Sequence, residues 1–309
     1  MSYPYLSDLL NALFETNLYI PIATFGGMVA IAIIVASTIA KKEVIRCENL
    51  GILPQTIPNS SPSIPTHQLV SGLTMVCAFS GIFGARLFHI LEYPYEFLAD
   101  PIAMIFSRQG LSIYGGLIVG AIGGAVFLRK RGIPLLSMLD AVAPAVALGY
   151  GIGRIGCQIS GDGDWGKTAN MALKPDWLPD WFWAQTYENN IAGVLIQSPG
   201  VYPTPLYEIL MAMCIFIFLW SIRKTKYSQG YMFSMYLLLS GFARLLIEKI
   251  RINSEYHFLQ MSFTQAEFIS IVLIGAGLIG ILKTTRSNAF SKIGISLVVV
   301  AALSACTKL

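Results

Sequence analysis

An arginine lies among glycines at the end of a long apolar run, in the stretch GYGIGRIGCQISGDGDWG at residues 149–166. Arg154 stays charged in any environment, and its forked guanidinium group matches the geometry of a phosphate. Asp162 and Asp164 follow within ten residues. A permanent cation beside two carboxylates, in so apolar a chain, is a candidate site for binding an anion.

Two more arginines stand inside apolar runs, where ionisable side chains are costly and by default indicate function. Arg86 lies near the end of one run, so its side chain could instead extend to the membrane surface. Arg244 precedes Glu248 by four residues, so the two share one helical face and could simply neutralise each other. Three further polar residues stand at the starts of other runs: Tyr114, Tyr207 and Glu208.

The elements that carry these residues are apolar helices. The chain has 309 residues, of which 55% are hydrophobic and 12% are charged, whereas a soluble domain carries roughly a quarter charged residues. Several apolar stretches approach the roughly 20 residues that cross a bilayer as a helix. The sequence therefore predicts an all-α, polytopic membrane protein. Its five cysteines form no CxxC pair, which argues against a disulfide framework and a metal site.

We expect seven transmembrane helices and an ambiguous eighth apolar segment. The predicted spans are 19–40, 68–91, 113–128, 135–158, 206–222, 231–250 and 266–282, and the eighth run is 293–305. Gly116, Gly120 and Gly124 are spaced four residues apart, which predicts close packing of the third span against a neighbour. The spans form a single integral membrane domain over residues 1–309, with a small external head at 161–205 and an apolar tail at 289–309.

Basic residues in the loops set the orientation, because cytoplasmic loops are enriched in Lys and Arg. The first, third, fifth and seventh loops hold twelve basic residues, among them Lys41, Lys42 and the run at 129–131. The alternate loops hold five, with Arg251 among them. We therefore expect the odd-numbered loops to be cytoplasmic, and the N-terminus and the loop at 161–205 to be external.

This orientation brings polar residues from five helices to one depth. The three arginines lie in the outer parts of spans that run outward, and Tyr114, Tyr207 and Glu208 start spans that run inward. We expect a site that is open to the outside and binds the anionic headgroup of a phospholipid. The charge of its phosphodiester would offset a cost of burying arginines that the protein otherwise cannot meet.

Four ordered stretches resemble the bacterial prolipoprotein diacylglyceryl transferases: ADPIAMIF with GLSIYGGLIVG, GIGRIGCQISGDGDWG, YPTPLYE and GFARLLIE. The resemblance covers about residues 19–282. It implies a multi-pass enzyme of the bacterial cytoplasmic (inner) membrane that needs no cofactor and whose active site faces the outer leaflet. The implied reaction moves the diacylglyceryl group of phosphatidylglycerol to the lipobox cysteine of a prolipoprotein signal peptide. Its products are a thioether and glycerol phosphate.

The resemblance also implies roles for single residues. By their positions in the motifs, Arg154 and Arg244 would hold and stabilise the phosphate, and Arg86 would support them. Glu248 would orient Arg244 or assist proton transfer. The remaining residues expected at the substrates are Tyr114, Cys157, Asp162, Asp164, Tyr207 and Glu208.

The chain departs from the family pattern at three of these positions. Tyr114 stands where the family often has a histidine, and a tyrosine with a pKa of about 10 is a poor base unless nearby arginines depress it. Cys157 replaces an asparagine, and a thiol is a weak hydrogen-bond partner. Asp162 replaces a glutamate, so Asp162 or Asp164 would take over its polar role.

Two other functions stay open. A noncatalytic relative would bind phospholipid or lipoprotein precursors, and the departures at Tyr114 and Cys157 are consistent with it. A transporter of anionic lipid would place polar residues through the whole membrane depth and often contain an internal repeat. The inner halves of the spans are almost wholly apolar, and we find no repeat. Membrane lipids surround the protein in every case, and nucleic acid is not an expected partner.

The chain ends in SKIGISLVVVAALSACTKL, which has a basic start, an apolar core and an LSAC sequence like a lipobox. One interpretation is an apolar anchor with a chance match. The other is an in-built substrate mimic or a fused lipoprotein signal, which would carry a diacylglyceryl group on Cys306.

Overall fold

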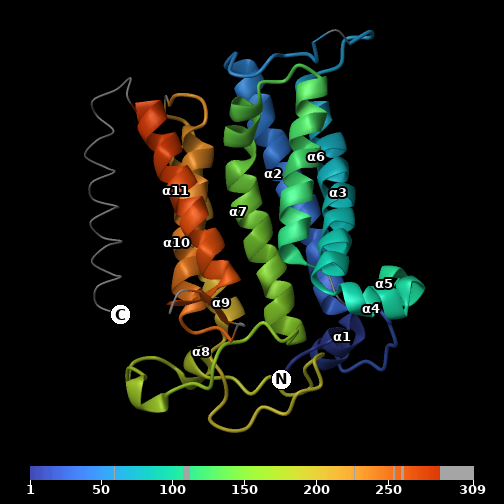
Figure 1. Cartoon of the computed structure of the whole chain (residues 1–309), viewed down its shortest axis with the longest axis vertical. Helices are drawn as coiled ribbons and strands as arrows, with labels where there is room; N and C mark the ends of the chain where they lie inside the picture. The colour runs from blue at the N-terminus through green and yellow to red at the C-terminus, as the bar shows by residue number, and fades with distance from the viewer. Residues whose placement is uncertain (59, 107–111, 226, 253–254, 259–260, 286–309) are drawn as a thin grey trace. The chain divides into compact units, whose positions relative to one another are not determined.

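The computed structural model describes residues 1–58, 60–106, 112–225, 227–252, 255–258 and 261–285. Most of this chain is helical (Figure 1). It forms two compact units: the first comprises Met1–Ala36 with Ala143–Leu309, and the second comprises Ser37–Val142. Two long helices, α2 (Thr24–Asn49) and α7 (Leu135–Ser160), run through both units.

The first unit contains the candidate functional residues of the later part of the chain. Besides its parts of α2 and α7, it holds α1 (Leu6–Phe14), the 3-10 turn η2 (Met171–Leu173), α8 (Asp180–Trp183), α9 (Thr204–Ile222), α10 (Tyr231–Glu248) and α11 (Gln265–Thr285). Helices α9, α10 and α11 bury a common core of Leu219, Met232, Met235, Leu238 and Ile281. Gly277 lets α11 approach α10, because a Cβ there would lie 2.7 Å from the backbone nitrogen of Leu238.

The second unit is built around the pair α3 (Leu69–Glu92) and α6 (Ile113–Lys130). It also holds η1 (Thr66–Gln68) and two short helices that each begin with proline, α4 (Pro94–Ala99) and α5 (Pro101–Phe106). Proline suits the first position of a helix, where its missing N–H has no intrahelical partner. Gly116, Gly120 and Gly124 of α6 all face α3 at close range, as the spacing predicts.

A helix occurs at each of the seven predicted spans, although the first differs in its bounds. It begins at Thr24 rather than at residue 19, because Pro21 disfavours helical backbone and Ala23 instead pairs with Tyr5. In the described part of the chain, five helices are long and apolar enough to cross a membrane: Thr66–Glu92, Leu135–Ser160, Thr204–Ile222, Tyr231–Glu248 and Gln265–Thr285. The chain is therefore a helical membrane protein, and the number of crossings stays a prediction.

The all-α prediction misses one short sheet. Strands β1 (Glu255–Phe258) and β2 (Met261–Thr264) pair antiparallel, with Glu255 opposite Thr264. Their aromatic residues favour strands, but each strand has only four residues and is flanked by strongly helical apolar runs. The predicted eighth run and the tail at 289–309, with Cys306, lie outside the described residues.

Backbone pairing fixes where the loop after α7 lies within the first unit. Gly166 bridges to Arg251, its N–H donates to the carbonyl of Tyr202 (2.8 Å), and the N–H of Lys167 donates to the carbonyl of Ile250 (2.7 Å). No side chain fits at Gly166, since a Cβ there would lie 2.5 Å from the oxygen of Ile250. The end of α7, the start of α9 and the end of α10 consequently meet at one end of the unit (Figure 1).

Candidate active site

The first anchor of the candidate site is Asp164, which lies just after the end of α7. Gly161 and Gly163 both have positive φ angles, 61° and 99°, which turn the chain back over the end of the helix. One carboxylate oxygen of Asp164 binds Nη1 of Arg154, and the other lies 2.7 Å from Nη2 of Arg251. The Asp164 carboxylate thus joins arginines from α7 and from the end of α10.

The second anchor is Glu208 on α9, whose side chain is only 3% exposed. Its oxygens lie 3.2 Å from Nε of Arg154, 3.5 Å from Nη1 of Arg244 and 3.8 Å from Nη1 of Arg251. The hydroxyl of Tyr150 also donates to it, at 2.8 Å. Glu208 is therefore the carboxylate that all three guanidinium groups share.

The third carboxylate is Glu248, which pairs with Arg244 four residues earlier on α10 at 3.1 Å. The hydroxyl of Thr264, at the end of β2, donates a hydrogen bond to the carboxylate of Glu248 at 2.6 Å. This pair matches the neutralising interpretation of the Arg244–Glu248 spacing, but Arg244 also reaches Glu208 and so belongs to the same cluster.

These contacts correct the expectation that a phosphodiester must offset the buried arginines. Among the residues that the structure describes, three guanidinium groups face three carboxylates, so the ionised cluster carries no net charge. Some guanidinium N–H groups of the cluster nevertheless lack a hydrogen-bond acceptor among the described residues. Within the described residues, Nε and Nη1 of Arg251 are buried and have no hydrogen-bond acceptor. Buried N–H groups of this kind are costly unless an acceptor arrives.

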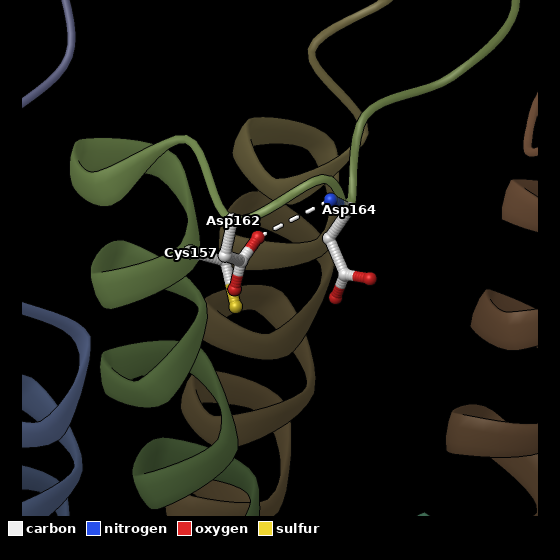
Figure 2. A group of neighbouring side chains, drawn as sticks. All are labelled: Cys157, Asp162 and Asp164. Carbon is white, nitrogen blue, oxygen red and sulfur yellow. Dashed lines mark hydrogen bonds between the residues drawn. The ribbon is translucent and has the colours of Figure 1, made fainter. Parts of the chain in front are cut away.

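Cys157 and Asp162 form a second group beside the cluster. Figure 2 shows the Asp162 carboxylate next to the Cys157 sulfur, while the Asp164 carboxylate lies to one side of them. The N–H of Asp164 donates to Asp162 at 3.2 Å, and Nη1 of Arg154 lies 3.7 Å from the sulfur. The ligand atoms of the three labelled residues lie within 4.8 Å of one another. Both oxygens of Asp164 already bind guanidinium groups, so the trio is a poor set of metal ligands.

The two aspartates titrate in opposite directions. Burial raises the pKa of Asp162, and its hydrogen bond with the Cys157 thiol offsets only part of this rise. Burial would also raise the pKa of Asp164, but the charges of Arg251 and Arg154 outweigh burial and hold this pKa below its ordinary value. Asp162 is therefore the better proton acceptor of the two, and Asp164 remains a fixed anion.

Three further predicted site residues are Tyr207, Arg86 and Tyr114. Tyr207 sits one position before Glu208 on α9 and donates its hydroxyl to the carbonyl of Phe182 in α8 at 2.8 Å. Arg86 and Tyr114 belong to the second unit, where Nη1 of Arg86 donates to the carbonyl of Met104 at 2.9 Å. The predicted place of Arg86 and Tyr114 beside the arginine cluster stays a prediction.

Arg251 is the functional candidate that the sequence analysis missed, because it was counted among the external loop charges. A signal was available: Arg251 follows Arg244 by seven residues, two helical turns further along the same face. Its N–H donates to the carbonyl of Ile247 at 3.1 Å, so the helical course continues past the end of α10.

Known proteins are similar in sequence to this chain over more than half of its length. A family model described as prolipoprotein diacylglyceryl transferase matches residues 11–283. Three relatives carry the name phosphatidylglycerol–prolipoprotein diacylglyceryl transferase. The relative from Leptospira interrogans is 29% identical over 208 residues, which is 58% of this chain and 60% of that protein. The relative from Shouchella clausii is 30% identical over 64% of this chain and 68% of that protein.

The third relative, from Dehalococcoides mccartyi, is 28% identical over 211 residues, or 68% of this chain and 74% of that protein. The alignment with the Leptospira relative spans less than two thirds of that relative's length. The family model, in contrast, runs from within α1 to within the last turn of α11 and includes every residue of the arginine cluster. The chain belongs to the prolipoprotein diacylglyceryl transferase family.

Proposed function

We propose that this protein transfers the diacylglyceryl group of phosphatidylglycerol to the lipobox cysteine thiol of a prolipoprotein signal peptide. Membership of the family and the names of the relatives support this reaction. The observation that carries it is the buried arginine cluster, in which Arg154, Arg244 and Arg251 share Glu208. Two Arg251 nitrogens have no acceptor among the described residues. Phosphate oxygens are suitable acceptors for guanidinium N–H groups.

In this proposal the cluster binds the phosphodiester of the lipid. Arg154 and Arg244 contact the phosphate, as the family motifs imply, and the unsatisfied nitrogens of Arg251 complete its hydrogen bonds. Glu208 and Glu248 hold Arg244 in position, and Asp164 holds Arg154 and Arg251. Donors placed before the reaction begins stabilise the charge that develops on the leaving phosphate.

The transfer exchanges one bond at the glycerol carbon. The substrate's sulfur, as a thiolate, attacks the diacylglyceryl carbon that carries the phosphate ester. A carbon–sulfur bond forms, the carbon–oxygen bond breaks, and its electron pair leaves with glycerol phosphate. The thiol proton needs an acceptor, because a free thiol with a pKa near 8.5 is mostly protonated at neutral pH. We assign this role to Asp162, whose pKa is raised by burial; Tyr114 is the alternative acceptor.

The orientation proposed for this reaction rests on the loop charges, and its place in the bacterial cytoplasmic membrane rests on the family. The protein would form one integral domain in the bacterial cytoplasmic membrane, crossing it seven times with an external N-terminus. Residues 161–205 would form the external head, and the arginine cluster would face the outer leaflet. Arg86 and Tyr114 would complete the site, with Tyr207 at its edge.

Complementation tests the proposal directly. Cells depleted of their own transferase would receive the parent chain, Arg154→Ala, Tyr114→Phe, or Arg129→Ala as a control that removes an arginine from a predicted cytoplasmic loop. We expect growth and lipoprotein modification with the parent and Arg129→Ala, and failure with Arg154→Ala. A parent chain that inserts into the membrane but does not rescue would refute the proposal in favour of a noncatalytic lipid-binding relative. Rescue by Arg154→Ala would show that the cluster is not the active site.

A further inference from the structure

A separate cavity of about 320 Å³ lies in the second unit. The loop after α2 and the turn between α6 and α7 line it, with Ile57, Pro58, Ser60, Lys130, Arg131 and Gly132. In Figure 1 this loop and this turn lie at the end of the second unit opposite α4 and α5. The volume lies within the range of roughly 300–1,000 Å³ that small-molecule sites occupy.

Hydrogen bonds connect the described residues on the loop side of the cavity. The N–H of Ile57 donates to the carbonyl of Ile64 at 2.8 Å, and the hydroxyl of Thr66 donates to the carbonyl of Pro54 at 2.6 Å. Ser60 bonds the carbonyl of Ile57 at 2.8 Å through its hydroxyl. These bonds tie the loop to itself and to the start of η1, so the wall does not depend on a ligand.

The turn wall is equally well defined. Gly132 has a φ of 67°, a conformation that favours glycine, and the next residue, Ile133, is 4% exposed. The guanidinium carbon of Arg131 lies 3.7 Å from the centre of the Phe127 ring, and its Nη1 donates to the Phe127 carbonyl at 3.4 Å. Stacking therefore holds one cation of the cavity in a fixed orientation.

The charges of this cavity are not compensated, in contrast to those of the arginine cluster. None of its lining residues is acidic. Within the described ranges, neither Lys130 nor Arg131 has a carboxylate at ion-pair distance. A fixed guanidinium group and a flexible ammonium group favour an anion with several oxygen atoms, and phosphate is the common one.

We infer that this cavity binds the phosphate group of an anionic phospholipid in the cytoplasmic leaflet. Lys130 and Arg131 end a helix that is expected to cross the membrane, in a loop that the distribution of basic residues predicts to be cytoplasmic. Basic pockets at this depth suit anionic headgroups, and the apolar side chains of Ile57 and Pro58 suit the glycerol and the first carbons of the acyl chains. The inference does not depend on the proposed transferase activity.

The test measures binding of phosphatidic acid to the delipidated full-length protein in neutral detergent by native mass spectrometry. The variant is Lys130→Gln with Arg131→Gln. The control is Lys41→Gln with Lys42→Gln, which removes the same charge from exposed positions of α2 that do not line the cavity. We expect about 25-fold weaker binding of one lipid in the variant and unchanged binding in the control, because each basic residue near an anionic lipid contributes about fivefold.

Lys130→Arg with Arg131→Lys keeps both charges and should retain most of this binding, which separates loss of charge from misfolding. Phosphatidylcholine should not compete, because its headgroup carries no net charge. Equal loss in variant and control would overturn the inference by showing attraction to the surface as a whole. Unchanged binding in the Gln variant would also overturn it, as would competition by soluble glycerol phosphate at the affinity of the lipid, which would assign the cavity to a free phosphate.

Discussion

Replacing Glu208 with Gln tests the cluster at its shared carboxylate. The change keeps the shape of the side chain and an oxygen that can accept the hydrogen bond of Tyr150, but it removes the negative charge that lies 3.2–3.8 Å from three guanidinium groups. Removing one partner of a buried ion pair costs about 3–5 kcal/mol. Because the Arg244 side chain is 23% exposed and Asp164 and Glu248 remain, we expect the lower end, about 3 kcal/mol.

A loss of about 3 kcal/mol corresponds to a fall of about 6 °C in the apparent unfolding midpoint of a chain this size. Intrinsic tryptophan fluorescence of the protein in detergent measures this midpoint. The matched control is Asp180→Asn, which removes a carboxylate that is 78% exposed from its ion pair with Lys174. We expect that change to cost less than about 1 kcal/mol. Equal midpoints for Glu208→Gln and the parent would refute the assignment of Glu208 as the shared anchor.

The remaining predictions concern the groups around this anchor. In the parent, the transfer rate should fall as the pH drops through the raised pKa of Asp162, because the protonated carboxyl cannot accept the thiol proton. Asp162→Asn should slow transfer at all pH values and abolish this fall. A pH–rate profile that keeps the same fall at acid pH would contradict the assigned role. Because that pKa is raised in the folded state, ionised Asp162 costs stability at neutral pH and the cost disappears below the ordinary value of 3.8, so Asp162→Asn should also raise the unfolding midpoint at pH 7. Arg251→Lys keeps a positive charge beside Asp164 but removes the forked guanidinium group. It should lower kcat/KM at least tenfold with little change in the unfolding midpoint. If the C-terminal tail is a substrate mimic, the intact mass of the purified protein should include a diacylglyceryl increment that Cys306→Ser abolishes; an unmodified mass would favour the apolar anchor.

The sequence predicts the helices well because the membrane imposes their length and composition. Apolar runs of near 20 residues leave few alternatives to a helix, and each predicted span contains one. The bounds are less predictable where proline and pairing with the N-terminus decide them, as at Thr24. The β1–β2 hairpin escapes prediction because its eight paired residues carry a weak signal between two strong helical ones.

The cluster was only partly predictable, for a different reason. Arg154, Arg244 and Glu248 are charged residues inside apolar runs, so the sequence alone indicates that they are functional. The spacing of seven residues from Arg244 points to Arg251, but its place beside Asp164 also depends on a long-range backbone bridge to Gly166, which no local pattern encodes. Loop counting treats every cation outside a span as equivalent, so it placed Arg251 with the surface charges. The role of Glu208 as the shared carboxylate likewise appears only when α7, α9 and α10 are brought together.

The charge balance of the cluster determines how it would act on a phosphodiester. Since its guanidinium groups and carboxylates cancel, a bound diester adds charge to a neutral cluster, and binding must rest on unused donors such as Nε and Nη1 of Arg251. When the carbon–oxygen bond breaks, the leaving phosphate gains further negative charge, and the same fixed donors then bind it more strongly than they bound the substrate. Glu208→Gln would give the cluster a net positive charge and loosen its arginines. It should therefore lower KM for phosphatidylglycerol while lowering kcat about 100-fold, which is the kinetic pattern of a site that has lost preference for the transition state.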